Sequence, residues 1–202
     1  MKKGFTLLEL LIVIGILAIL STTIILVINP AETLRKARDS QRISDLNTLK
    51  TAIAYYVTSV GTPSIGNDTN SYSYVSGVTD CVGRSTGTST ASQAVDGTGW
   101  IPVNFATITG GSPIGALPID PNPTVFDYSA GKARYYVYAA YTTDNTFELL
   151  ANMESTYYSQ GGDGDVESKD GGATGLTKIY EVGTRLGIIT ASSATCFLGD
   201  GT

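Results

Sequence analysis

Hydrophobic residues are concentrated at the start of the chain, where they form one nearly unbroken run. Residues 5–28 are rich in Leu and Ile, and Glu9 is the only charged residue among them. About 20 apolar residues suffice for a helix to cross the hydrocarbon core of a bilayer, so we expect a transmembrane helix over residues 5–29. A carboxylate inside such a helix is costly, which makes Glu9 a candidate functional residue.

Beyond this run the hydrophobic positions become periodic. Pro30 predicts a kink, because proline removes a backbone hydrogen bond and clashes with the preceding turn. Apolar residues at spacings of three and four then predict an amphipathic helix over residues 30–60, ended by Gly61-Thr62-Pro63. Its apolar face is formed by Leu46, Leu49, Ile53, Tyr56, Val57 and Val60. Its other faces are expected to carry the charged residues Asp39, Arg42, Asp45 and Lys50.

Residues 61–202 alternate turn signals with short segments rich in aromatic and β-branched residues, the pattern of a β-rich head domain. The clearest signal is an antiparallel hairpin with strands at residues 134–141 and 146–153 around a short polar turn. Residues 84–98 predict an exposed loop, and the prolines of residues 117–123 predict a rigid connector. Further strands are expected at residues 72–78, 100–105 and 178–182.

Composition and charge exclude several classes of function. The chain has 202 residues, no histidine and a formal charge of −5. The lack of histidine removes the commonest general base and the Ser-His-Asp and Cys-His arrangements, so we do not expect an enzyme. An acidic chain lacks the clustered Lys and Arg that phosphate binding needs. No nucleic-acid site is therefore expected, and the tyrosines of residues 134–141 are interpreted as sheet packing rather than as a platform for bases.

The first ten residues carry a specific motif. Residues 2–10, KKGFTLLEL, combine a basic pair, Gly-Phe and a lone Glu at the start of the apolar run. This segment resembles the class III signal of type IV pilins and type II secretion pseudopilins. The resemblance implies that a prepilin peptidase cleaves after Gly4, that Phe5 is then N-methylated, and that Glu9 neutralises the terminal amine of a neighbouring subunit. An ordinary signal peptide would have a shorter apolar region, and a plain anchor would leave Glu9 unexplained.

The resemblance also implies the organisation of the whole chain. It predicts an α+β pilin fold, in which one long N-terminal α-helix packs on a small antiparallel β-sheet. Residues 1–4 would be the prepilin leader, 5–29 the transmembrane and filament-core helix, 30–60 the amphipathic helix and 61–202 the globular head. Before assembly the subunit would cross the inner, cytoplasmic membrane once with its head outside. It would later form part of a surface or periplasmic filament.

The implied partners are other copies of the chain, a prepilin peptidase, an assembly platform with its ATPase, and the membrane before assembly. Basic residues lie on both sides of the apolar run, so charge alone does not set its orientation. The run Arg35-Lys36-Ala37-Arg38 has three interpretations: a solvated helix face, pairing with acidic groups of a neighbouring subunit, or contact with lipid headgroups.

Two further features of the head bear on export and metal binding. If the head is exported, Cys81 and Cys196 are expected to form a disulfide, and the alternative is two unpaired thiols.

The Gly- and Asp-rich residues 161–172 are loosely similar to the calcium loop of some major pseudopilins, although they do not fit the EF-hand pattern. The alternative there is an acidic solvent loop, and no other cofactor is expected. The candidate calcium ligands are Asp163, Asp165, Glu167 and Asp170.

These observations predict a structural function. The chain is expected to be the subunit of a type IV pilus-like filament, or fimbrium, that polymerises through its N-terminal helix. One alternative within the same class is a pseudopilin of a protein secretion system. An alternative from another class is a membrane-tethered binding module that does not polymerise. Loss of assembly on replacement of Glu9 would separate the filament subunit from the tethered module.

Overall fold

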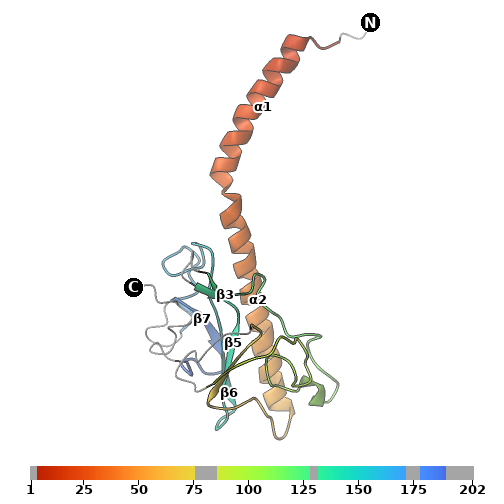
Figure 1. Cartoon of the computed structure of the whole chain (residues 1–202), viewed down its shortest axis with the longest axis vertical. Coiled ribbons are helices and arrows are strands. Elements are labelled where there is room, and N and C mark those ends of the chain that lie inside the picture. The colour runs from red at the N-terminus through yellow and green to blue at the C-terminus, as the bar shows by residue number, and fades with distance from the viewer. Residues whose placement is uncertain (1–3, 76–85, 128–131, 172–177, 190–202) are drawn as a thin grey trace. The chain divides into compact units, whose positions relative to one another are not determined.

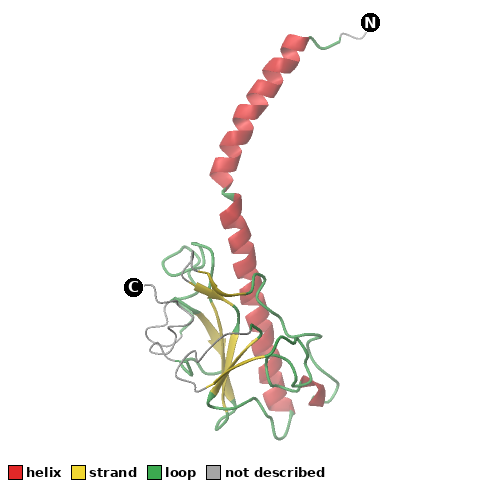
Figure 2. Cartoon of the chain, viewed as in Figure 1, coloured by secondary structure: helices red, strands yellow, loops and turns green. Residues whose placement is uncertain are grey.

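The computed structural model divides into two compact units, Met1–Arg35 and Lys36–Thr202, which are described one after the other. Figure 1 follows the chain from end to end, and Figure 2 shows its helices, strands and loops. The residues that the structure describes are 4–75, 86–127, 132–171 and 178–189.

The first unit contains helix α1 (Leu7–Ile28) and the start of helix α2 (Pro30–Ser59). The helices are separated at Asn29, which adopts a left-handed conformation with φ 44° and ψ 75° that asparagine tolerates. The Asn29 side chain also accepts the N–H of Glu32 at 3.3 Å and so caps α2. Proline suits the first helical position, because no partner is needed for its missing N–H. The kink predicted at Pro30 is therefore a break that divides the expected long helix into two.

Within the described residues, no helix is long and apolar enough to cross a membrane. The transmembrane role of residues 5–29 stays a prediction.

The second unit is built on a five-stranded sheet in the order β2-β1-β5-β6-β7. The strands β1, β5, β6 and β7 are antiparallel neighbours, and β2 adds to β1 in parallel at one edge. The bounds are β1 Asn70–Ser73, β2 Thr86–Ser89, β5 Val137–Tyr141, β6 Thr146–Ala151 and β7 Tyr180–Gly183. A separate two-stranded ribbon pairs β3 (Thr124–Asp127) with β4 (Lys132–Arg134). The helix and the antiparallel sheet confirm the predicted α+β class.

The hydrophobic core lies between α2 and one face of the sheet. The predicted apolar face of α2 is confirmed, since Leu46, Leu49, Ile53 and Tyr56 are buried in one cluster with sheet residues such as Tyr138. The Tyr138 hydroxyl donates to the Ile65 carbonyl at 2.7 Å, which satisfies its polar end. Tyr138 of β5 therefore packs in the core, in agreement with the expected role of these tyrosines in sheet packing. Burial of one large aliphatic side chain, such as that of Leu46 or Ile53, contributes about 1.5–3 kcal/mol to folding.

The predicted hairpin is confirmed as β5 and β6, and the strand expected at 178–182 is confirmed as β7. The turn between β5 and β6 uses Asn145 with φ 54°. It is held by Asp68, whose carboxylate accepts the Thr142 N–H at 2.5 Å. The first predicted residue of the hairpin, Arg134, ends β4 instead and pairs with Thr124 of β3, and β5 begins only at Val137. The strand expected at 72–78 begins earlier, at Asn70, and ends at Ser73.

The strand expected at residues 100–105 was a wrong prediction. Trp100, Ile101, Val103 and Phe105 are buried, but they form no strand, and Phe105 opens the 3₁₀ helix η1 (Phe105–Thr107). Pro102 has no N–H to give to a ladder, and the Trp100 indole N–H donates to the Pro118 carbonyl at 3.0 Å. The segment therefore fills the core instead of extending the sheet.

The loop expected at residues 84–98 was wrong in part, because Thr86–Ser89 form strand β2. The following residues fold back closely on the buried segment. A Cβ at Gly99 would lie 2.0 Å from the Ala94 carbonyl oxygen, so the backbone approach there requires glycine. The connector at residues 117–123 is confirmed as irregular chain with no helix or strand.

Replacing Ile53 by Ala is predicted to destabilise the head by about 2–5 kcal/mol, because it leaves a cavity in a closely packed core. Chemical denaturation of the full chain in detergent would measure the loss. Tyr55→Ala is the matched control, since Tyr55 lies on the same helix and is 49% exposed, and its effect should stay within about 0.5 kcal/mol. Equal effects of the two changes would contradict this assignment of the core face.

Candidate functional site

The predicted cleavage position lies in accessible chain ahead of α1. Gly4 and Phe5 precede the first helical residue, Leu7, and the Phe5 side chain is 83% exposed. A Cβ built on Gly4 would meet no atom within 4 Å. The fold therefore does not require glycine at this position, and a requirement for it would come from an enzyme that binds the segment.

Glu9 is held by the start of its own helix. Thr6 is the N-cap of α1, and its hydroxyl accepts the Glu9 N–H at 3.2 Å. In return, Glu9 Oε2 accepts the Thr6 N–H at 3.0 Å and the Thr6 hydroxyl at 2.8 Å. This is a capping box, which satisfies N–H groups that the first helical turn leaves unpaired. The Thr-x-x-Glu spacing was a readable signal that the sequence analysis missed.

The capping box also fixes the position of the negative charge of Glu9. A carboxylate in the first turn interacts favourably with the N-terminal end of the helix dipole. The bond from the Thr6 N–H keeps the Glu9 carboxylate one residue from Phe5, where cleavage after Gly4 would create an amine. The structure thus fixes Glu9 to Thr6, the residue next to the predicted new N-terminus at Phe5.

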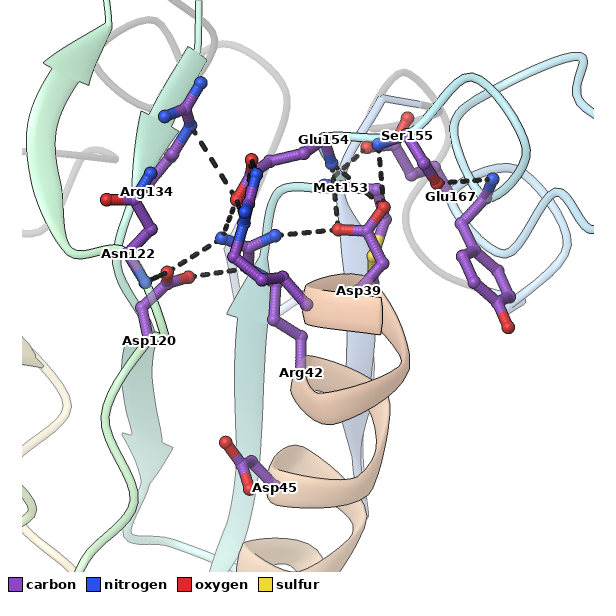
Figure 3. Close-up of polar contacts among 12 residues, drawn as sticks. Asp39, Arg42, Asp45, Asp120, Asn122, Arg134, Met153, Glu154, Ser155 and Glu167 are labelled. Atoms are coloured by element: carbon purple, nitrogen blue, oxygen red, sulfur yellow. Dashed lines mark hydrogen bonds and ion pairs between the residues drawn. The ribbon is translucent and has the colours of Figure 1, made fainter. Parts of the chain in front are cut away.

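The head contains a buried ion cluster centred on Arg42 (Figure 3). The Arg42 guanidinium binds Asp120 through two hydrogen bonds, from Nε at 2.7 Å and from Nη2 at 2.8 Å. Its Nη1 donates to Asp39 at 2.7 Å, and its Nη2 also donates to Glu154. Asp39, Arg42 and Asp120 are all buried. The cluster joins α2 to the connector and to the loop after β6.

Further groups surround this centre and satisfy its carboxylates. Arg38 binds Glu154 through Nε at 3.1 Å and Nη2 at 2.6 Å. Arg134 approaches the same carboxylate, with Nε 3.9 Å from Oε1. Asp39 accepts the backbone N–H groups of Glu154 at 2.9 Å and Ser155 at 2.7 Å. Three arginines therefore oppose three carboxylates, so the cluster is formally neutral.

Two groups of this cluster, Glu154 and Arg42, are stabilised in their ionised forms. Burial disfavours the carboxylate of Glu154, but hydrogen bonds from Arg38 and Arg42 outweigh it and lower its pKa to about 2. Burial likewise opposes the charge on Arg42, but Asp120 and Glu154 raise the pKa of Arg42 above its ordinary value. Groups that stay ionised across the physiological range are poor acids and bases. The arrangement therefore suits holding elements together.

The expectation that Asp39 and Arg42 lie on faces of α2 other than its buried face was wrong, because both are buried at the cluster. The signal that could have revealed this is their spacing, since positions 39 and 42 continue the three-and-four series of Leu46 and Leu49. Asp45 lies beside the core and accepts the Tyr136 hydroxyl at 2.9 Å. Asp120 was expected only as part of a rigid connector.

The basic run at residues 35–38 makes contacts within its own chain. Arg38 pairs with Glu154, and Lys36 lies over the ring of Tyr157, with Nζ 4.5 Å from its centroid. The Arg35 side chain is half-exposed, and its Nη1 lies 3.7 Å from Oε2 of Glu32. The interpretation of a solvated helix face therefore holds for the exposed residues Arg35 and Lys36, whereas Arg38 is partly buried by its pair with Glu154.

The four candidate calcium ligands differ in their burial and in their hydrogen-bond partners. Hydrogen bonds from the Ser168 hydroxyl and from backbone N–H groups lower the pKa of Asp165 to about 2. Glu167 accepts the N–H groups of Met153 and Gln160, each at 3.0 Å. Asp163 is exposed, and Asp170 accepts the Glu181 N–H at 2.7 Å.

Across the described ranges, no three acidic, His or Cys side chains gather as a metal site would need. Calcium binding by this loop stays a prediction. Cys81 and Cys196 lie outside the described residues, so the disulfide also stays a prediction.

Replacing Arg42 by Ala is predicted to cost about 3–5 kcal/mol of folding stability, because it leaves buried carboxylates without their counter-ion. Arg42→Lys should restore only part of the loss, since an ammonium cannot form the two parallel bonds to Asp120. Denaturation of the full chain would report both values. Arg35→Ala serves as the control for a surface pair and should change stability by less than about 0.5 kcal/mol. A loss below about 1 kcal/mol for Arg42→Ala would contradict the central role of this side chain.

The low pKa of Glu154 predicts an acid-sensitive contribution to stability. A depressed pKa stabilises the fold above the unfolded value of about 4.3, and this contribution disappears as the pH falls toward about 2. Wild type should therefore be more stable than Glu154→Gln near neutral pH, and the difference should shrink below pH 4. Melting temperatures of both chains across this range would test it, and a difference that is constant with pH would contradict it.

Comparison with known families gives one match. Residues 1–25 match the family model described as the prokaryotic N-terminal methylation motif. No curated protein and no solved structure matches the chain. The matched residues include Gly4, Phe5, the capping box and most of α1. The chain therefore begins with a prokaryotic N-terminal methylation motif, as the resemblance to type IV pilins and pseudopilins predicts.

Proposed function

We propose that the chain is the structural subunit of a type IV pilus-like filament, made as a prepilin, cleaved after Gly4 and N-methylated at Phe5. One observation carries the proposal. An accessible Gly-Phe bond lies directly ahead of a capped apolar helix with a lone Glu9 in its first turn, inside the matched methylation motif. A prepilin peptidase and a methylating activity are the processing partners that this chemistry requires.

Assembly is proposed to exchange the partner of Glu9. In the single chain, the Glu9 carboxylate accepts two hydrogen bonds from Thr6. Cleavage creates a positive amine at Phe5, and both charges are costly in a low-dielectric environment unless they are paired. An amine from a neighbouring subunit would relieve both costs and set the axial register between subunits.

Polymerisation is proposed to bury the apolar surface of α1. Its large side chains are exposed in the single chain, including Leu7, Ile12 and Ile19. Before assembly, residues 5–29 would anchor the subunit in the cytoplasmic membrane with the head outside. An assembly platform with its ATPase would then move subunits into a surface or periplasmic filament, where neighbouring α1 helices replace lipid.

The tethered binding module has one structural feature in its favour. A groove of about 570 Å³ runs between α2 and residues Pro113 and Ile114 of the head. Its helical wall is uncharged and includes Asn47, Thr48 and Tyr55. A small neutral ligand could fit there, but the groove does not account for the lone Glu9. A pseudopilin shares the same motif and differs in where its filament forms.

Replacing Glu9 by Gln is predicted to abolish filaments while leaving processing intact. Glutamine at this position can still complete a capping box, so the change removes the charge and leaves the helix start in place. Intact-mass and N-terminal peptide mass spectrometry of membrane and sheared surface fractions would measure both steps. Wild type should appear in the sheared fraction as a chain that begins at Phe5 with one added methyl group.

The matched control is Thr6→Ser, which keeps the capping hydroxyl and should assemble like wild type. Processed wild-type chain found only in the membrane would favour a pseudopilin. A chain that retains residues 1–4, or one cut beyond the apolar run, would overturn the filament proposal. If the Glu9→Gln chain formed normal filaments, the charge of Glu9 would not be needed for assembly.

A further inference from the structure

The irregular chain between α2 and β1 carries a short acceptor motif at the surface of the head. Asn67-Asp68-Thr69 has the pattern Asn-x-Ser/Thr, which accepts N-linked glycans. All three residues are exposed, and Asp68 and Thr69 form the turn that leads into β1. The motif is therefore accessible without any unfolding of the head.

The motif at Asn67 stands alone in the sequence. Of the asparagines in the chain, only Asn67 and Asn122 are followed two residues later by Ser or Thr. Pro123 lies between Asn122 and Thr124, and proline at this place, with its fixed φ, makes the pattern a non-acceptor. Asn122 is therefore an internal comparison for Asn67.

The side-chain amide of Asn67 is bound by Thr69. Its Oδ1 accepts the Thr69 N–H at 2.7 Å and the Thr69 hydroxyl at 2.5 Å. The backbone bond alone is enough for an asparagine turn, so the hydroxyl adds a second donor to the same oxygen. Two donors stabilise negative charge on Oδ1, which favours the loss of a proton from the amide nitrogen. The arrangement therefore favours Nδ2 as a nucleophile.

The loop is anchored to the sheet on both sides of Asn67. On one side, the Ile65 carbonyl accepts the Tyr138 hydroxyl at 2.7 Å. On the other side, the Asp68 carboxylate accepts the Thr142 N–H at 2.5 Å. These two bonds hold the backbone beside the β5–β6 hairpin, so the folded head keeps position 67 at its surface.

The proposed function determines which sugar donor can reach this loop. If the head lies outside the cytoplasmic membrane, the sugar has to be supplied there. A nucleotide sugar is soluble and carries phosphate charges, which are costly to move through the hydrocarbon core. A glycan that is linked through a diphosphate to a membrane lipid stays at the membrane, where it can be presented to the head.

We propose that Asn67 is an N-glycosylation site that accepts a glycan from a lipid-diphosphate carrier. In the transfer, Nδ2 forms a bond to the anomeric carbon of the glycan, and the bond from that carbon to the diphosphate oxygen breaks. The lipid diphosphate leaves with the electron pair of the broken bond, and the Nδ2 proton passes to a basic group of the transferase. The site rests on the proposed function in one respect, because the head must lie outside the membrane.

Peptide mass spectrometry of the full chain, isolated from the cells that make it, tests the site. Trypsin cuts after Lys50 and Arg84, so Asn67 and Asn122 fall in different peptides. The reduced peptide of residues 51–84 should carry a glycan on Asn67, and Asn122 should be bare. A bare Asn67 in the wild-type chain would overturn the glycan site. The same digest reports the N-terminus separately, and a chain that retains residues 1–4 would overturn the filament proposal instead.

Variants separate the acceptor motif from the surrounding loop. Asn67→Gln and Thr69→Ala should both lose the glycan, and Thr69→Ser should retain it, because serine keeps the hydroxyl. Asn70→Gln is the matched control, since Asn70 lies in the same peptide but outside the motif, and it should leave the glycan in place. Asn67 and Thr69 are exposed, so these changes are expected to leave the head folded. A glycan that persists in Thr69→Ala would overturn the role of the hydroxyl, and one that persists in Asn67→Gln would overturn the site.

The carrier is tested in the same cells. Sequestering the released lipid diphosphate, for example with bacitracin, should lower the fraction of newly made chain that carries the glycan on Asn67. A fraction that does not change would overturn the lipid carrier.

Discussion

The burial of one guanidinium group, that of Arg42, constrains most of the head. A buried positive charge is tolerated only when it is fully paired, and here its partners come from α2, from the connector and from the loop after β6. The position of α2 on the sheet is therefore tied to the paths of two distant loops. The apolar core lies on the same face of α2. It begins at Leu46, next to the ion cluster, and packs this face against the sheet.

Strand β6 and the residues after it place two glutamates in different surroundings. Leu149 points into the core, Glu148 is buried on the sheet face that points away from α2, and Glu154 lies just beyond the end of the strand in the ion cluster. The two glutamates respond to pH in opposite directions, because arginines lower the pKa of Glu154 and burial raises that of Glu148. Protonation of Glu154 at low pH and ionisation of Glu148 as the pH rises therefore both act against the stability of this part of the head.

The N-terminal segment follows different physics, since its chemistry is local. Thr6 and Glu9 are three residues apart and satisfy each other at the start of α1. The same carboxylate can serve helix initiation in a single chain and charge neutralisation in an assembly. In the single chain, the bonds to Thr6 compensate this acidic residue within an otherwise apolar segment; under the proposed function, a neighbouring amine would later take their place.

The sequence by itself determined the features that depend on short-range pattern. The apolar run of the first helix, the periodic apolar positions of the second, the break near Pro30, the hairpin of β5 and β6 and the N-terminal motif all follow from neighbours within a few positions, where backbone geometry decides the outcome. The apolar residues 100–105 have the composition of a strand, but the N–H groups of Trp100 and Phe105 donate to loop carbonyls, those of Ser92 and Val95. Only the tertiary structure decided which charged residues are buried. Arg42 meets Asp120 and Glu154 across separations of 78 and 112 positions, and Glu148 and Glu181 come to lie on one face of the sheet only through the pairing of β6 with β7. The local sequence pattern does not reveal such distant pairings, because they form only when the folded chain brings these groups together and packing removes water from them.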